Sequence, residues 1–263
     1  NGFFILKDGN SVTDQSGNGN DFTVAGGTLT KTEDNPSNVF ATANPLVVIG
    51  NTGQTYADGN LTFNASGNNW TATNSTIGAS QGKWYAEFKV VTLASSTGYG
   101  NLGITGTENI TNGNFISTEA NSVGLGLDYR AGANVAVYSG GSYVQAAGAD
   151  FAVNAIIGIA VDMDNKKFYL SHNGTYLTVG GSVGDPTSGS TGTGALTIPT
   201  GIETFLFAVG GYSTSFKGTC NFGNGYFGTT AVSTAGTNAS GNGIFEFDCP
   251  TGYTALSTKG LNL

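Results

Sequence analysis

Charged side chains are scarce in this chain of 263 residues, and their scarcity excludes several kinds of partner. Lys, Arg, Asp and Glu together make up 10% of the residues, and nine cations against 17 anions give a formal net charge of −8. Nucleic-acid phosphates require clustered Lys and Arg, and the sequence never assembles such a cluster. We therefore expect no nucleic-acid partner, and an anionic membrane surface is disfavoured for the same reason.

Long apolar runs and histidine are also scarce. The longest nearly apolar stretch, Ala155 to Val161, is far shorter than the roughly 20 residues of a membrane-spanning helix, so we expect no membrane insertion. The only histidine, His172, precedes the turn Asn173-Gly174 and is interpreted as structural or surface-exposed rather than as a general base. The first residue is Asn1 rather than Met, from which we expect a processed product or a fragment of a longer polypeptide.

Glycine and aromatic residues, by contrast, are abundant. The chain has 43 Gly, 16 Phe and 11 Tyr, and 38% of its residues are hydrophobic. This composition is typical of a turn-rich globular protein and not of a disordered, charge-rich chain. All-β proteins of this length commonly form one domain.

The stretch from Ile156 to Gly174 indicates the fold class most clearly. Apolar residues alternate before the turn formed by residues 162–165 and again after it, which is the pattern of a β-hairpin with one buried face. Asp162 and Asp164 point the same way in that turn, as a carboxylate pair would, but turn formation explains them better. Further strands are predicted over 84–91, 99–105, 122–129, 134–140 and 203–212. The pattern predicts an all-β antiparallel sandwich with very little helix, the one helix candidate being residues 117–121.

The strong strand positions define a predicted core. It consists of Trp84, Phe88, Ile157, Ile159, Val161, Phe168, Leu170, Phe205 and Phe207.

The first 75 residues differ from the rest of the chain in their sequence pattern, because clusters of turn-forming residues separate short apolar segments. We expect residues 1–75 to form an N-terminal arm with early strands over 3–6, 22–24, 45–49 and 60–63, packing on a sandwich that spans residues 76–263. Two low-complexity stretches, 184–194 and 229–243, are predicted to be exposed loops.

Four segments in the same order resemble the SPRY family, a concanavalin-like β-sandwich. They are GKWYAEFKV (82–90), GLGLDYRAG (124–132), the hairpin 156–174 and FLFAVGG (205–211). More closely, six segments look like those of SPRY-containing structural proteins of tailed bacteriophages: 15–23, 34–46, 58–61, 76–88, CNFGNGYF (220–227) and CPTGYTALSTKGL (249–261). Residues 228–243 depart from this pattern as an inserted loop.

The resemblance implies a jelly-roll sandwich and a non-enzymatic component on the virion surface, such as a distal tail-fibre module. SPRY domains bind ligands through loops at one end of the sandwich, and concanavalin-like relatives hold sugars. Fold alone does not establish that role.

Aromatic residues beside polar ones are the candidates for ligand binding, because a ring covers a sugar face while polar neighbours bond its hydroxyls. Tyr129 and Arg130 follow Asp128 at the end of a predicted strand, where the resemblance places part of the binding surface; a strand-end Tyr with a solvated Arg is the alternative. Asn134 ends the same loop. The predicted ligand-binding set also includes Tyr143, which follows the next Gly-rich turn, and Trp70, whose ring is predicted to be exposed.

No cofactor is predicted, although one loop has some of the oxygen ligands of a calcium site. Asp14, Ser16 and Asn18 match the alternating oxygen ligands of the first half of a looped calcium motif, but its twelfth position is Ala25 instead of a bidentate Glu. Asx-turns on glycines are the competing explanation. Cys220 and Cys249 either form a disulfide or are two buried thiols.

The sequence thus favours a virion module that binds a host-surface glycan or protein. We expect it to form a homotrimer and to contact other virion subunits. The alternative is a capsid or tail decoration protein that makes subunit contacts without receptor binding. A polysaccharide-degrading enzyme is disfavoured because acidic residues are sparse and unpaired.

Overall fold

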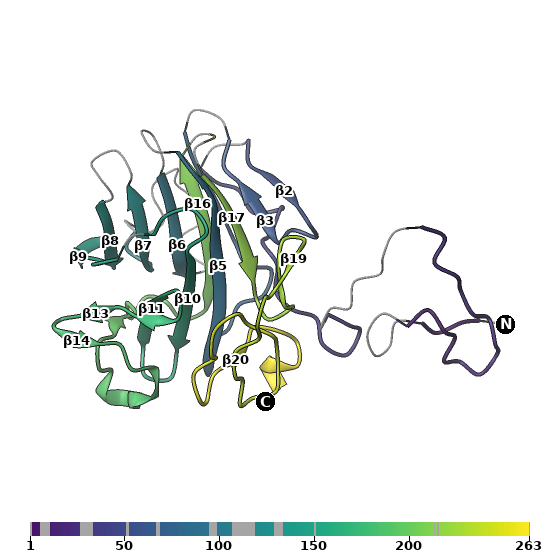
Figure 1. Cartoon of the computed structure of the whole chain (residues 1–263). Helices are drawn as coiled ribbons and strands as arrows, with labels where there is room; N and C mark the ends of the chain where they lie inside the picture. The colour runs from purple at the N-terminus through teal and green to yellow at the C-terminus, as the bar shows by residue number, and fades with distance from the viewer. Residues whose placement is uncertain are drawn as a thin grey trace.

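Most strands of the protein belong to two facing antiparallel sheets (Figure 1). The computed structural model describes residues 2–5, 11–26, 34–50, 53–66, 69–94, 99–106, 119–128, 134–149, 151–212, 214 and 216–262. One sheet has seven strands in the order β1 (Ile49–Gly50), β4 (Trp70–Asn74), β16 (Phe205–Tyr212), β6 (Tyr99–Gly106), β7 (Ser122–Asp128), β8 (Asn134–Ser139), β9 (Ser142–Ala146).

The other sheet has nine strands. Its main path is β12 (Thr175–Tyr176), β11 (Lys167–His172), β10 (Ile156–Asp162), β5 (Lys83–Leu93), β17 (Phe216–Asn221), β3 (Thr62–Asn64), β2 (Thr55–Ala57). In addition, β15 (Leu196–Thr197) pairs with β11, and β20 (Thr254–Ala255) runs parallel to β5.

Smaller elements lie outside these sheets. β13 (Thr178–Val179) pairs with β14 (Ser182–Val183), and β18 (Tyr226–Phe227) pairs with β19 (Thr230–Ala231). Two short 3-10 helices are described, η2 (Pro186–Thr191) and η4 (Gly260–Asn262). Among the described residues, no helix is both long and apolar enough to cross a bilayer.

The core between the sheets confirms the predicted strand register. All nine predicted core residues are buried in one apolar cluster, and Phe168 is 0% exposed. The hairpin pairs β10 with β11 so that Val161 lies opposite Phe168 and Ile159 opposite Leu170. Directly opposed residues share a face of the sheet, so alternation in the sequence was sufficient to place these side chains.

The N-terminal predictions were less successful. Residues 3–5 and 22–24 form no strand, and the expected strand over 45–49 is reduced to β1. Backbone groups there bond locally instead: Phe4 N–H donates to Asp14 Oδ1 at 2.8 Å, and Phe22 N–H donates to the Val12 carbonyl at 3.1 Å. A strand needs a neighbour to complete its ladder, and an apolar run does not supply one.

The division at residue 75 also differs from the structure. β1 to β4 are members of the two sheets, whereas residues 2–5 and 11–26 lie to one side of the sandwich (Figure 1). The longest of the strands that the sequence did not predict are β4, β9 and β17. The helix candidate at 117–121 is a bend and turn over residues 119–121, and its first two residues are outside the described part.

The last segment of the chain covers the outer face of the nine-stranded sheet. We call residues 222–262 the C-terminal cover; in Figure 1 its yellow-green trace lies against β5. A second buried cluster joins the sheet to this cover: Phe40, Tyr85, Ala160, Tyr169, Phe245, Cys249, Tyr253 and Ala255. The insertion 228–243 belongs to the cover, because Cys249 N–H donates to the Thr237 carbonyl and Gly236 N–H to the Phe245 carbonyl, each at 2.9 Å.

A buried carboxylate attaches the cover to the sheet. Glu87 of β5 is 0% exposed. Its two oxygens accept hydrogen bonds from the backbone N–H groups of Glu246 and Phe247, each at 2.8 Å. The Tyr85 hydroxyl and the Asn221 amide each donate a further bond at 3.3 Å. Burial raises the pKa of Glu87 to about 7, and these four hydrogen bonds lower it only in part.

This pKa predicts a pH-dependent stability. The folded-state pKa of Glu87 lies above its ordinary value of 4.5, so its stabilising contribution is present below about pH 4.5 and is lost as the pH rises through about 7, a change of about 3 kcal/mol. We expect the difference in unfolding free energy between the wild-type protein and Glu87→Gln to move by about that amount against the wild type between pH 4.5 and 8, measured by urea denaturation.

Glu203→Gln, at an exposed carboxylate, controls for the loss of one charge. A wild-type advantage over Glu87→Gln that stays constant or grows with pH would contradict the assignment.

Candidate functional site

Three aromatic side chains form a row across the seven-stranded sheet. Tyr212 of β16 pairs with Trp70 of β4, and the register of β16 against β6 places Tyr99 on the other side of Tyr212. The ring centroids of Trp70 and Tyr99 are 5.3 Å apart, those of Trp70 and Tyr212 5.5 Å, and those of Tyr99 and Tyr212 5.7 Å, all edge to face. Tyr99 is buried, whereas Trp70 and Tyr212 are half-buried. We call these three residues the aromatic row.

The strand register extends the line of the aromatic row to the two residues that flank the loop predicted as the binding surface. Tyr99 lies opposite Asp128 of β7, and Asp128 lies opposite Asn134 of β8. Cross-strand partners share a face, so five strands contribute to one line of residues. Tyr129 and Arg130, the centre of the predicted site, lie outside the described residues.

Tyr143 does not join this line. It lies on β9 opposite Tyr138, with ring centroids 6.0 Å apart. Tyr138 is four residues after Asn134 on β8, which is about 13 Å at the rise of a strand. Because β7, β8 and β9 are consecutive antiparallel strands, the β7–β8 and β8–β9 connections lie at opposite ends of the sheet. Tyr143, which follows the β8–β9 turn, therefore cannot contribute to a binding surface at the loop after Asp128. Tyr143 is 61% exposed, and Trp70, predicted to be exposed, is half-buried by its two ring contacts.

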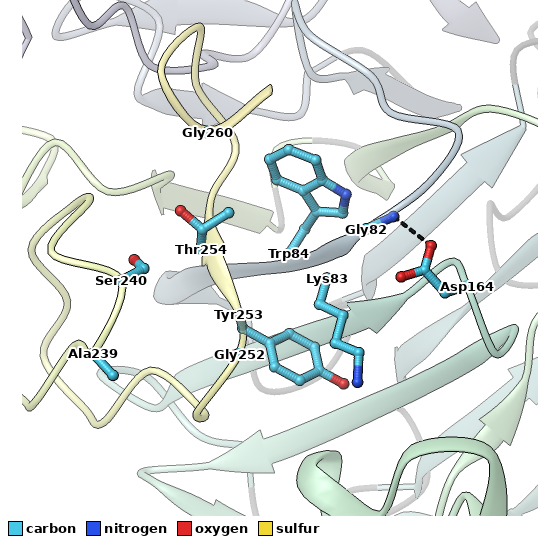
Figure 2. A pocket seen from close by; sticks show the side chains of 10 residues that line it. All are labelled: Gly82, Lys83, Trp84, Asp164, Ala239, Ser240, Gly252, Tyr253, Thr254 and Gly260. Carbon is cyan, nitrogen blue, oxygen red and sulfur yellow. Dashed lines mark hydrogen bonds between the residues drawn. The ribbon is translucent and has the colours of Figure 1, made fainter. Parts of the chain in front are cut away.

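A second candidate is a cavity of about 390 Å³ between β5 and the C-terminal cover (Figure 2). Figure 2 shows the Lys83 side chain extending beside the Tyr253 ring, and Lys83 Nζ is 5.7 Å from the ring centroid. Lys83 Nζ also lies 3.2 Å from Asp162 Oδ2, and the Tyr253 hydroxyl donates to the Pro186 carbonyl at 3.1 Å. These polar groups already have protein partners, so the cavity favours packing of the cover over ligand capture.

The two carboxylates of the hairpin turn do not act as a pair. Asp162 is buried, and in addition to Lys83 it accepts hydrogen bonds from the Asn165 backbone and side chain at 2.9 and 2.8 Å. Asp164 is exposed and accepts a hydrogen bond from Gly82 N–H at 2.7 Å, drawn in Figure 2. Each carboxylate stabilises the turn through separate partners, as the turn-forming explanation predicted.

The single histidine has an aromatic neighbour. The His172 ring packs on Phe151 with centroids 4.8 Å apart, and Nε2 lies 3.3 Å from Asn173 Nδ2. Within the described ranges, no group of three or more His, Cys, Asp and Glu side chains is arranged to hold a metal ion.

The oxygens of the candidate calcium loop are occupied by hydrogen bonds. Asp14 accepts bonds from the backbone N–H groups of Phe4, Ser16 and Asn20 and from the Ser16 hydroxyl, at 2.8 to 2.9 Å. The Ser16 hydroxyl bond is the largest of the effects that hold the pKa of Asp14 far below its ordinary value. Asn18 donates its amide to the Gly2 carbonyl at 3.0 Å. This arrangement favours the Asx-turn explanation over calcium.

The two cysteines are free, buried thiols. Cys220 belongs to the core between the sheets, and Cys249 belongs to the cluster on the outer face of the nine-stranded sheet. The sheet therefore separates them, and of the two interpretations that the sequence allowed, the structure shows the buried thiols. Burial raises the pKa of Cys249 to about 12 and also raises that of Cys220, which makes both poor nucleophiles at neutral pH.

Comparison with solved structures finds SPRY-type sandwiches. The SPRY domain of human HERC1 aligns with a TM-score of 0.50 and 13% sequence identity, over 68% of this chain and 96% of that chain. The PSpry domain of TRIM65 aligns with a TM-score of 0.47 and 10% identity, over 69% of this chain and 91% of that chain. No family model and no curated protein matches the sequence. At such identities the likeness to the HERC1 domain shows the fold alone, which is the all-β sandwich that the sequence predicted.

Proposed function

We propose that this chain is a non-enzymatic recognition module of a bacteriophage virion surface, in which the aromatic row and the adjoining β7–β8 loop hold a host-surface glycan or protein. The observation that supports it is the aromatic row itself. Three rings from three strands meet at the end of the seven-stranded sheet where the β5–β6, β7–β8 and β16–β17 connections begin or end. The bacteriophage setting and the tail-fibre role rest on the sequence resemblance.

Two half-buried rings held edge to face suit this task physically. Trp70 and Tyr212 are fixed by their contacts with each other and with Tyr99, so little side-chain entropy is lost when a ligand covers them. An indole or phenol face covers the apolar face of a sugar ring or of a peptide side chain. By strand register, Asp128 and Asn134 continue the same line of residues.

Replacing two of the rings tests the proposal. We expect the double variant Trp70→Ala and Tyr212→Ala to bind host cells, or their extracted envelope glycans, at least about tenfold more weakly, because each truncation removes a stacking surface worth about 1 kcal/mol or more. Tyr129→Ala with Arg130→Ala should weaken binding in the same assay.

Tyr143→Ala is the matched control, since it removes an exposed ring from the same sheet at a distance from the aromatic row. Thermal melting of each variant separates lost binding from lost folding. A folded double variant that binds as well as the wild type would refute recognition through the aromatic row.

The N-terminal segment favours the second candidate function, a capsid or tail decoration protein. Four of its apolar side chains are 42 to 57% exposed: Phe3, Phe4, Phe22 and Val24. The ring centroids of Phe3 and Phe22 are 4.6 Å apart. The segment therefore presents a small apolar surface that a neighbouring virion subunit would cover.

The oligomeric state tests that subunit contact. We expect the full chain to form a homotrimer in light scattering, and the double variant Phe3→Ser and Phe22→Ser to shift it toward monomer, because burial of the apolar segment is lost. Phe4→Ser is a single-site comparison. Equal masses for the wild type and the double variant would remove the support for this contact.

A further inference from the structure

A cavity on the outer face of the nine-stranded sheet is lined by two residues whose buried hydroxyl groups have no protein partner. Its volume is about 540 Å³, within the range of ligand-binding pockets. One wall is formed by Tyr85, Ser171 and Tyr176 of the sheet. The other is formed by the C-terminal cover, at residues 233–236 and 246–248. This cavity is distinct from the cavity of Figure 2 and from the aromatic row.

The orphan groups are Ser171 Oγ and Tyr176 Oη. Both atoms are buried and neither has a hydrogen-bond partner. Ser171 is 1% exposed as a residue. A buried hydroxyl without a partner is destabilising. Two such hydroxyls at one cavity therefore require an explanation, and a ligand that bonds to both would remove the cost.

A third hydroxyl lies close by. Tyr85 Oη and Ser171 Oγ both lie within 2.5 Å of the position that a Cβ on Gly158 would occupy, so the absence of a side chain at Gly158 makes room for both. Tyr85 Oη donates to Glu87 at 3.3 Å and still has lone pairs to accept from a ligand. A hydroxyl group both donates and accepts hydrogen bonds. The ligand that complements these three hydroxyls is therefore one whose own groups both donate and accept hydrogen bonds.

The remaining walls describe the rest of the ligand. Tyr85, Tyr176 and Phe247 contribute aromatic surface. Phe247 is held against the β11–β12 turn, because its ring lies 2.5 Å from where a Cβ on Gly174 would be. No Lys or Arg lines the cavity, whereas Glu246 and Asp248 do. An anionic ligand would therefore be repelled.

The acidic residues of the lining are also engaged with the cover. Glu246 accepts hydrogen bonds from the backbone N–H and hydroxyl of Ser233. Asp248 accepts bonds from the backbone N–H and hydroxyl of Thr237 at 2.6 and 2.8 Å. They shape the cavity and leave recognition to the neutral hydroxyls of the sheet.

From this geometry we infer that the cavity binds a small neutral polyhydroxylated molecule of the size of a monosaccharide or cyclic polyol, through Ser171, Tyr176 and Tyr85. The inference does not depend on the proposed function, because it concerns the outer face of the other sheet. A ligand of this size held by three hydroxyls is expected to bind with a dissociation constant of about a millimolar.

The test uses methyl β-D-glucopyranoside, methyl α-D-mannopyranoside and myo-inositol as probes of the full chain, measured by saturation-transfer NMR and by the rise in melting temperature. We expect at least one probe to bind, and the double variant Ser171→Ala and Tyr176→Phe to bind it at least tenfold more weakly. Tyr143→Phe, which removes an exposed hydroxyl elsewhere, and Trp70→Ala, in the aromatic row, should leave this binding unchanged.

The probe-free melting temperature provides a second readout. Removing two orphan hydroxyls should leave the melting temperature unchanged or raise it; a fall would show that the hydroxyls bond within the folded protein or to fixed water, and would overturn the inference. The absence of binding by every probe at 50-fold the expected dissociation constant would also overturn it, as would equal binding by the double variant. Loss of probe binding in Trp70→Ala would move the site to the aromatic row.

Discussion

The buried carboxylate of Glu87 is the interaction on which the outer layer of this sandwich depends. A β-strand presents alternate residues to opposite faces, so β5 directs Trp84, Ala86 and Phe88 into the core and Tyr85 and Glu87 to the other side. Four donors surround the Glu87 oxygens, and two of them are backbone N–H groups of the C-terminal cover. Without the cover, Tyr85, Ala160 and Tyr169 would lie on a solvent-exposed face; with it, these three residues are buried.

This constraint separates the roles of the two sheets. The C-terminal cover packs on the outer face of the nine-stranded sheet, and in the described part of the chain two cavities lie between its strands and the cover. The seven-stranded sheet carries the aromatic row at one end, where several connections between strands begin or end. The aromatic row lies on strands of the seven-stranded sheet, and binding groups held on strands keep their geometry better than groups held on loops alone.

The central fold was predictable from the sequence because its signal is local. Alternation in the hairpin 156–174 placed Ile157, Ile159, Val161, Phe168 and Leu170 in one core, as the structure shows. Strands were expected at 3–6 and 22–24, but the described residues 3–5 and 22–24 form none. Pairing is not local, and these apolar segments have no adjacent strand among the described residues. The aromatic row is non-local in the same sense, since Trp70, Tyr99 and Tyr212 are far apart in the chain and meet only through the register of three strands. The same holds for Glu87, whose partners Glu246 and Phe247 are about 160 positions away.

The two tryptophans allow one direct measurement of the proposed recognition surface. Trp84 is buried and its indole N–H donates to the Gln81 carbonyl at 2.7 Å, whereas Trp70 is half-buried in the aromatic row. Their indole N–H signals can be followed by proton–nitrogen NMR of the labelled full chain during titration with extracted host-envelope glycans. The account predicts that the Trp70 signal shifts progressively to saturation while the Trp84 signal stays in place. Binding of the same glycans, established by an independent assay, with no change in the Trp70 signal would contradict it.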